Sequence, residues 1–219
     1  MRVHHLGSLL LLAALAPAIG AQEARELRVA IQPEAGAAIR AEQGAALRIQ
    51  PSSKVWVEGN STVRRYKCEA ARVSGSVAVD PASSSTAIAD LQKAVTGVEL
   101  SIPVAQLACG DNTMDGHMRK ALQAESHPTI TFRLTSHEVL PQGTEKGTVK
   151  MTGRLNIAGK ENVVTVSAEA TQEANGGLRV KGSKELKMTE FGVKPPTLMM
   201  GTLKVHDPVT VHFDLILRQ

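Results

Sequence analysis

Apolar and polar residues alternate along most of the chain from Leu47 onward. A period of two is typical of β-strands that present one apolar and one polar face. Seven clear runs, together with the stretch from Lys54 to Gly59, therefore predict about eight strands. The predicted strands cover residues 54–59, 71–79, 98–104, 130–134, 149–157, 164–168, 178–188 and 209–217.

Turn-forming residues separate these runs, which fixes the expected fold class. Strands that are wet on one face pair in the antiparallel sense. Eight of them must either stack as a sandwich or close as a barrel, and closure leaves an interior for side chains or one ligand. The sequence thus predicts an all-β, antiparallel fold. The turns are expected at Asp80-Pro81, 141–143, 158–160, 175–177 and Asp207-Pro208.

Helical periodicity is confined to two short stretches. Residues 90–94 give a weak signal. In the stretch CGDNTMDGHMRKAL, which ends at Leu122, the apolar residues Met114, Met118 and Leu122 fall on one helix face. A polar residue within 111–113 is expected to cap the first turn of this helix.

The first residues have the layout of a secretory signal peptide. Arg2 precedes an apolar stretch, and small residues follow near Gly20 and Ala21, where cleavage is expected. The apolar stretch is shorter than the roughly 20 residues that span a bilayer, although an uncleaved anchor is the alternative. We therefore expect a periplasmic or secreted protein. The expected organisation is a signal peptide at 1–21, an N-terminal extension at 22–46 with one short strand near 26–32, and a barrel at 47–219.

Composition argues against nucleic acid as a partner. The formal net charge is only +4, and aromatic residues make up 2% of the chain. Single-stranded nucleic acid is bound on exposed aromatic side chains, and this chain has few to offer.

Cys68 and Cys109 are the two cysteines. In an exported protein such a pair most simply forms a disulfide, and the alternatives are free thiols or metal ligands. A bridge would close a loop of about 41 residues, which contributes about 4 kcal/mol in the chain-entropy model.

The helix stretch partly resembles a calcium loop. Asp111, Thr113, Asp115 and Gly116 occupy positions 1, 3, 5 and 6 of the EF-hand pattern. Position 12 must be a bidentate glutamate in that pattern, and here it is Leu122. We therefore do not expect calcium binding.

Zinc and nucleophilic catalysis also lack their usual spacing. Cys68, Cys109, His117 and His127 lie too far apart for a C-x₂₋₄-C and H-x₃₋₅-H site. No G-x-S-x-G motif is present, and a Cys109–His117 pair competes with the expected disulfide. We expect no metal, no cofactor and no enzymatic activity.

The predicted interior leaves two possibilities open. Its inward positions are mostly Val, Leu, Met, Ala and Gly, with few bulky aromatic residues to fill them. Composition alone does not decide between a ligand cavity and a dry, packed core.

Four segments together resemble the YceI-like family of polyisoprenoid-binding periplasmic proteins. They are KVWVEGNSTVRRYKCEA (54–70), HMRKALQAESHPTITF (117–132), RLNIAGKENVVTV (154–166) and MTEFGVKPPTLMMGTLKVHDPVTVHFDL (188–215). The resemblance covers residues 47–219 and implies a lipocalin-like barrel with a tunnel for a long isoprenoid or similar chain. The region of Pro195-Pro196 is expected near the tunnel or its mouth. The residues expected to contact the ligand are Val55, Val57, Met118, Leu122, Phe132, Leu155, Ile157, Val164, Val166, Met188, Phe191 and Leu198.

The expected function is a carrier or scavenger of an isoprenoid or other long-chain lipid. A cationic rim at Arg64, Arg65, Arg119 or Lys120 could pair with an anionic headgroup, and transient membrane contact is expected. The alternative is a ligand-free structural or stress-related interaction protein with a packed core. The sequence leaves the ligand and the oligomeric state open.

Overall fold

The computed structural model describes residues 46–82, 87–174 and 176–219. The expected signal peptide and residues 22–45 of the expected extension, including its short strand, lie outside the described residues. Within the described ranges, no helix is both long enough and apolar enough to cross a membrane.

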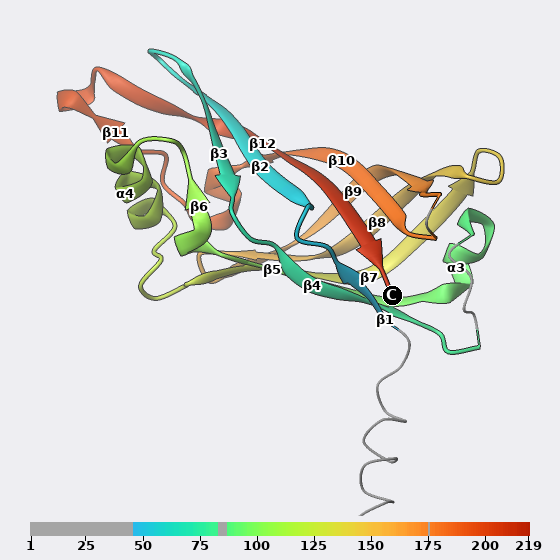
Figure 1. The fold of residues 1–219 in the computed structure, drawn as a ribbon. Coiled ribbons are helices and arrows are strands. Elements are labelled where there is room, and N and C mark those ends of the chain that lie inside the picture. The colour runs from blue at the N-terminus through green and yellow to red at the C-terminus, as the bar shows by residue number, and fades with distance from the viewer. Residues whose placement is uncertain (1–45, 83–86, 175) are drawn as a thin grey trace, which may run out of the picture. The chain divides into compact units, whose positions relative to one another are not determined.

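Antiparallel strands make up most of the described chain (Figure 1). The strands are β1 (Ala46–Ile49), β2 (Lys54–Ser61), β3 (Arg65–Ala70), β4 (Ser74–Val79), β5 (Val95–Pro103), β6 (Leu107–Ala108), β7 (Thr129–Pro141), β8 (Lys146–Ile157), β9 (Lys160–Gln172), β10 (Leu178–Lys187), β11 (Thr197–Leu198) and β12 (Leu203–Arg218). Short helical segments interrupt them, namely η1 (Ile88–Asp90), α3 (Leu91–Ala94), η2 (Val104–Gln106), α4 (Asn112–Ala121), η3 (Met188–Phe191) and η4 (Met199–Gly201).

The strands close into a barrel. Neighbours follow the order β1-β4-β5-β7-β8-β9-β10-β12, and β1 pairs with β12 at Arg48↔Arg218 and Ile49↔Leu217. Strands β2, β3 and β6 prolong this wall, because β2 pairs with β12, β3 with β2, and β6 with β3. The closed circuit of eight strands confirms the predicted antiparallel barrel and excludes a sandwich.

Helices α3 and α4 lie at opposite ends of the barrel (Figure 1). At the α3 end, the Gln92 side chain forms the backbone hydrogen bonds with β7 that a neighbouring strand would otherwise form. Its Nε2 donates to His137 O at 3.1 Å, and its Oε1 accepts from Val139 N at 2.8 Å. A cluster of buried apolar residues that includes Leu47 and Ile88 closes this end. Each buried aliphatic side chain of this kind contributes about 1.5–3 kcal/mol.

Among the described strands, β1, β3, β6 and β11 are absent from those that alternation predicts. Three of them have only two to four residues and are too short to show a period, whereas β3 has six. Its charged residues Arg65, Lys67 and Glu69 mask the apolar positions between them. Tyr66 and Cys68 still alternate with these charges and line the interior, so the signal was present at the correct period.

Asp207-Pro208 is not a turn, contrary to the prediction. The strand β12 continues through it, with a shift in its pairing to β2 between Val205 and Val209. Proline has no N–H to donate to a ladder and is tolerated at such irregularities, which explains why the dipeptide does not end the strand.

Met188 begins the 3₁₀ turn η3 and is not part of the strand predicted at 178–188. Pairing between β9 and β10 ends at Ala168↔Gly182, and η3 packs where these two strands part. Asn162 Nδ2 donates to Glu190 O at 2.8 Å and fastens η3 to β9.

Candidate functional site

The barrel encloses a cavity of about 770 Å³. Its wall consists mainly of inward-facing Val, Leu, Ile, Met and Phe side chains, contributed by nearly every strand of the barrel. Natural ligand sites have volumes of about 300–1,000 Å³ and a similarly apolar lining. The interior is thus hollow, which the amino-acid composition alone could not establish.

The cavity opens at the α4 end. The exposed residues of its lining lie on the β2–β3 turn, at the start of α4 and at the end of β10; they are Val63, Arg64, Asp111, Thr113 and Lys187. At the α3 end, lining residues such as Val77, Leu91, Val149 and Leu178 are all buried. The cavity therefore has one mouth and one blind end.

Three glycines keep the interior open by making room for aromatic rings. Gly182 and Phe213 are register partners, and a β-carbon on Gly182 would lie 2.7 Å from Phe213 Cζ. In the same way the Tyr66 ring covers Gly59, and the Phe132 ring covers Gly153. Because each ring lies against its glycine, the aromatic side chains occupy less of the cavity.

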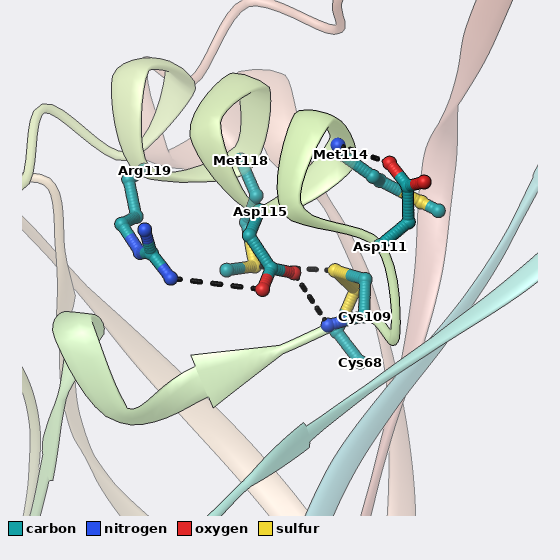
Figure 2. Close-up of a disulfide and its surroundings, with 7 residues drawn as sticks. All are labelled: Cys68, Cys109, Asp111, Met114, Asp115, Met118 and Arg119. Atoms are coloured by element: carbon teal, nitrogen blue, oxygen red, sulfur yellow. Dashed lines mark hydrogen bonds and ion pairs between the residues drawn. A yellow bond between two sulfur atoms is a disulfide. The ribbon is translucent and has the colours of Figure 1, made fainter.

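Helix α4 lies beside the mouth and is fixed by two aspartates (Figure 2). Asp111 Oδ1 accepts from Met114 N at 2.8 Å, which makes Asp111 the N-cap. Asp115 is buried, and its Oδ1 accepts from Cys109 N at 2.6 Å while its Oδ2 lies 3.6 Å from Arg119 Nη2. The helix is thereby held onto the strand that precedes it.

Cys68 and Cys109 form a disulfide, as predicted. The bridge joins β3 to the residues just before α4 (Figure 2), and Cys109 Sγ lies 3.7 Å from Met118 Sδ. Free thiols and a zinc site built on these two sulfurs are therefore wrong alternatives. Among the described residues, no group of three or more His, Cys, Asp or Glu side chains could hold a metal ion.

Tyr66 and Lys184 are among the polar side chains that line the otherwise apolar wall. Tyr66 lines the cavity, and burial raises the pKa of its phenol. Lys184 is half-buried on the inner face of β10, between Gly182 and Leu186, and forms no ion pair with any described residue. The sequence analysis singled out neither residue. Strict alternation along β10 places Lys184 on the inner face and could have revealed it.

All of the residues predicted to contact a ligand line this one cavity. They are Val55, Val57, Met118, Leu122, Phe132, Leu155, Ile157, Val164, Val166, Met188, Phe191 and Leu198. Pro196 lines it as well. Their role in binding stays a prediction.

The predicted cationic rim is only partly at the mouth. Arg64 lines the cavity, whereas Arg65, Arg119 and Lys120 do not. Arg119 instead pairs with Asp115, across one turn of α4. The remaining cations of the lining are Lys184 and Lys187 on β10.

The described residues thus form a closed β-barrel around an apolar cavity that opens at the α4 end. The YceI-like domain matches residues 49–217, and the chain therefore belongs to the YceI-like family. No curated protein matches the chain.

Solved structures share the fold. BcnA of Burkholderia cenocepacia is 24% identical with a TM-score of 0.60, and the match covers 77% of this chain and 98% of BcnA. A polyisoprenoid binding domain from Saccharophagus degradans, implicated in plant cell wall breakdown, is 14% identical with a TM-score of 0.62, covering 80% and 99% of the two chains. A YceI protein of Campylobacter jejuni is 19% identical with a TM-score of 0.50, covering 69% and 84%.

Proposed function

We propose that this protein binds an isoprenoid or similar long-chain amphiphile in its barrel and sequesters or carries it. The observation that carries the proposal is the apolar cavity of about 770 Å³ with a single mouth. The likeness to a domain described as polyisoprenoid-binding supports the same ligand class. A chain would lie along the wall of aliphatic residues, with its polar end near the mouth.

Burial of the chain supplies the affinity. Each methylene removed from water contributes about 0.8 kcal/mol, so about ten of them give roughly 8 kcal/mol before ordering costs. That corresponds to a dissociation constant of about 1 μM or weaker, which suits a carrier that must also release its ligand. Sequestration of this kind needs no catalytic group, in keeping with the expectation that the protein is not an enzyme.

We further propose that the protein acts outside the cytoplasm. On this view the signal peptide at 1–21 is removed near Gly20 or Ala21, and residues 22–46 precede the lipid-binding barrel at 47–219. The Cys68–Cys109 disulfide supports an oxidising compartment such as the periplasm.

Extraction of the purified protein with organic solvent, followed by mass spectrometry, tests the binding function. We expect a long apolar chain in the extract, or uptake of an added isoprenoid quinone or fatty amide by the stripped protein. A protein with neither would contradict the proposal and favour the ligand-free alternative, against which the hollow interior argues.

A further inference from the structure

Two neighbouring loop tips expose apolar side chains at the mouth of the cavity. Val63, on the turn between β2 and β3, is 69% exposed, and Met200 in η4 is fully exposed. Met200 also has a φ of 52°, in the left-handed region that residues other than glycine rarely adopt. Figure 1 shows both segments at the α4 end of the barrel. Neither exposure is explained by packing within the described chain.

Hydrogen bonds join the two tips into one surface. Thr62 N donates to Lys204 O at 3.0 Å, and Thr62 Oγ1 donates to Thr202 O at 3.0 Å. In return, Lys204 N donates to Thr62 Oγ1 at 3.2 Å. We call residues 61–66 and 197–206 together the tip surface.

The tip surface is positively charged. Arg64, Arg65 and Lys204 are exposed, and none of the three forms an ion pair with a described residue. Neither segment of the surface contains an aspartate or a glutamate. Exposed apolar side chains surrounded by unpaired cations suit the interface of a bilayer that contains anionic lipids.

The cavity reaches this surface. Val63, Arg64, Leu198, Leu203 and Val205 belong to the tip surface and also line the cavity. We propose that the tip surface docks on an anionic phospholipid bilayer and so places the mouth of the cavity against the membrane. The docking is a property of the surface alone, whereas its purpose, transfer of a lipid between membrane and barrel, rests on the proposed function.

Binding to vesicles tests the docking. The full-length mature protein is sedimented with vesicles of phosphatidylcholine alone or with about one third phosphatidylglycerol. We expect at least about tenfold tighter binding to the anionic vesicles, and loss of that preference at high salt because the Debye length falls to about 3 Å at 1 M. Equal, weak binding to both kinds of vesicle would overturn the proposal.

Matched variants locate the docking on the tip surface. Arg65→Gln/Lys204→Gln should abolish the preference for anionic vesicles, and Met200→Ser should weaken binding to both kinds several-fold. The controls are Lys150→Gln/Lys181→Gln on the outer wall and Leu140→Ser near the α3 end, which remove the same numbers of exposed cations and apolar side chains. Equal losses in the control variants would overturn the assignment, as would a wild-type dimer that Met200→Ser dissociates.

Uptake of an isoprenoid quinone added from ethanol, without vesicles, separates the two proposals. Met200, Arg65 and Lys204 do not line the cavity, so their variants should keep this uptake while losing transfer from vesicles. Vesicle binding without uptake of the quinone would contradict the proposed function and leave the docking proposal intact. Uptake of the quinone without vesicle binding would contradict the docking proposal alone.

Discussion

Gly182 on β10 and Phe213 on β12 are register partners, and the phenyl ring lies where a side chain at position 182 would have to be. A β-carbon there would also lie 2.9 Å from Ser167 O on β9. Glycine at position 182 therefore allows the Phe213 ring to lie against the wall, and it also allows the close approach of Ser167 O.

Gly182→Ala should destabilise the protein by about 1–3 kcal/mol, because the added methyl group overpacks the wall. It should also weaken ligand uptake, since the Phe213 ring must move into the cavity. Urea unfolding measures the first effect and ligand titration the second. Gly97→Ala is the matched control: its nearest neighbour would be Ala78 Cβ at 3.8 Å, an ordinary contact. Equal stability of Gly182→Ala and Gly97→Ala would contradict the account.

Gly116 lies inside α4 without a structural need for glycine. Apart from its chain neighbours and the backbone of its own helix, no atom lies within 4 Å of the position that its β-carbon would occupy, and its φ is not in the left-handed region. Gly116→Ala should therefore stabilise the protein by up to about 1 kcal/mol through helix propensity. Gly110→Ala, at a φ of +78°, should instead cost about 1–2 kcal/mol. Thermal unfolding compares them, and a destabilised Gly116→Ala would show that the glycine has a role at the mouth.

The Cys68–Cys109 disulfide should make a large contribution to stability. It closes a loop with a sequence separation of 41 residues, which corresponds to about 4 kcal/mol in the chain-entropy model. Cys68→Ser/Cys109→Ser should lower the free energy of unfolding by about that amount, and reductant should have a similar effect on the wild type only. A double variant as stable as the wild type would contradict this role.

The Arg179–Asp214 pair predicts a pH dependence on the outer wall. Arg179 donates to Asp214 from Nε at 2.7 Å and from Nη2 at 2.6 Å, and these hydrogen bonds lower the pKa of the Asp214 carboxyl. A lowered pKa in the folded state stabilises the protein above the unfolded value of about 3.9. This contribution is lost as the pH falls through the folded pKa.

Asp214→Asn should accordingly be less stable than the wild type at pH 6, and the difference should vanish in strong acid. Urea unfolding across this pH range measures it. Glu138→Gln serves as the control, because exposed Glu138 forms no ion pair with a described residue. A difference between Asp214→Asn and wild type that stays constant with pH would rule out the pair as its cause.

The barrel and most of its inner face follow from alternation, because a period of two assigns each residue to one face of a strand. The pattern misses the short strands β1, β6 and β11, and also β3, where charges flank Tyr66 and Cys68. It also mistakes the bulge at Asp207-Pro208 for a turn. The error at the bulge arises because local composition does not report strand pairing, and the bulge depends on how β12 pairs with β2.

Whether the interior is hollow could not be read from the sequence. It depends on pairs such as Gly182–Phe213 and Gly153–Phe132, whose members are distant in the chain and meet only through strand register. The resemblance to the YceI-like family named residues that do line the cavity, but not the inward Lys184. The hydrogen bond from Cys109 N to Asp115 was also beyond the sequence, since it depends on how the chain turns from β6 into α4.

Filling the cavity tests the central claim most directly. Val166 on β9 is buried and lines the cavity, while its neighbour Ser167 is exposed on the outer face. Native mass spectrometry with an added isoprenoid quinone compares Val166→Trp with Ser167→Trp, after circular dichroism has shown that both are folded. The wild type and Ser167→Trp should take up the quinone, and Val166→Trp should not. Equal uptake by both variants, or uptake by none of the three proteins, would contradict a lipid-binding cavity.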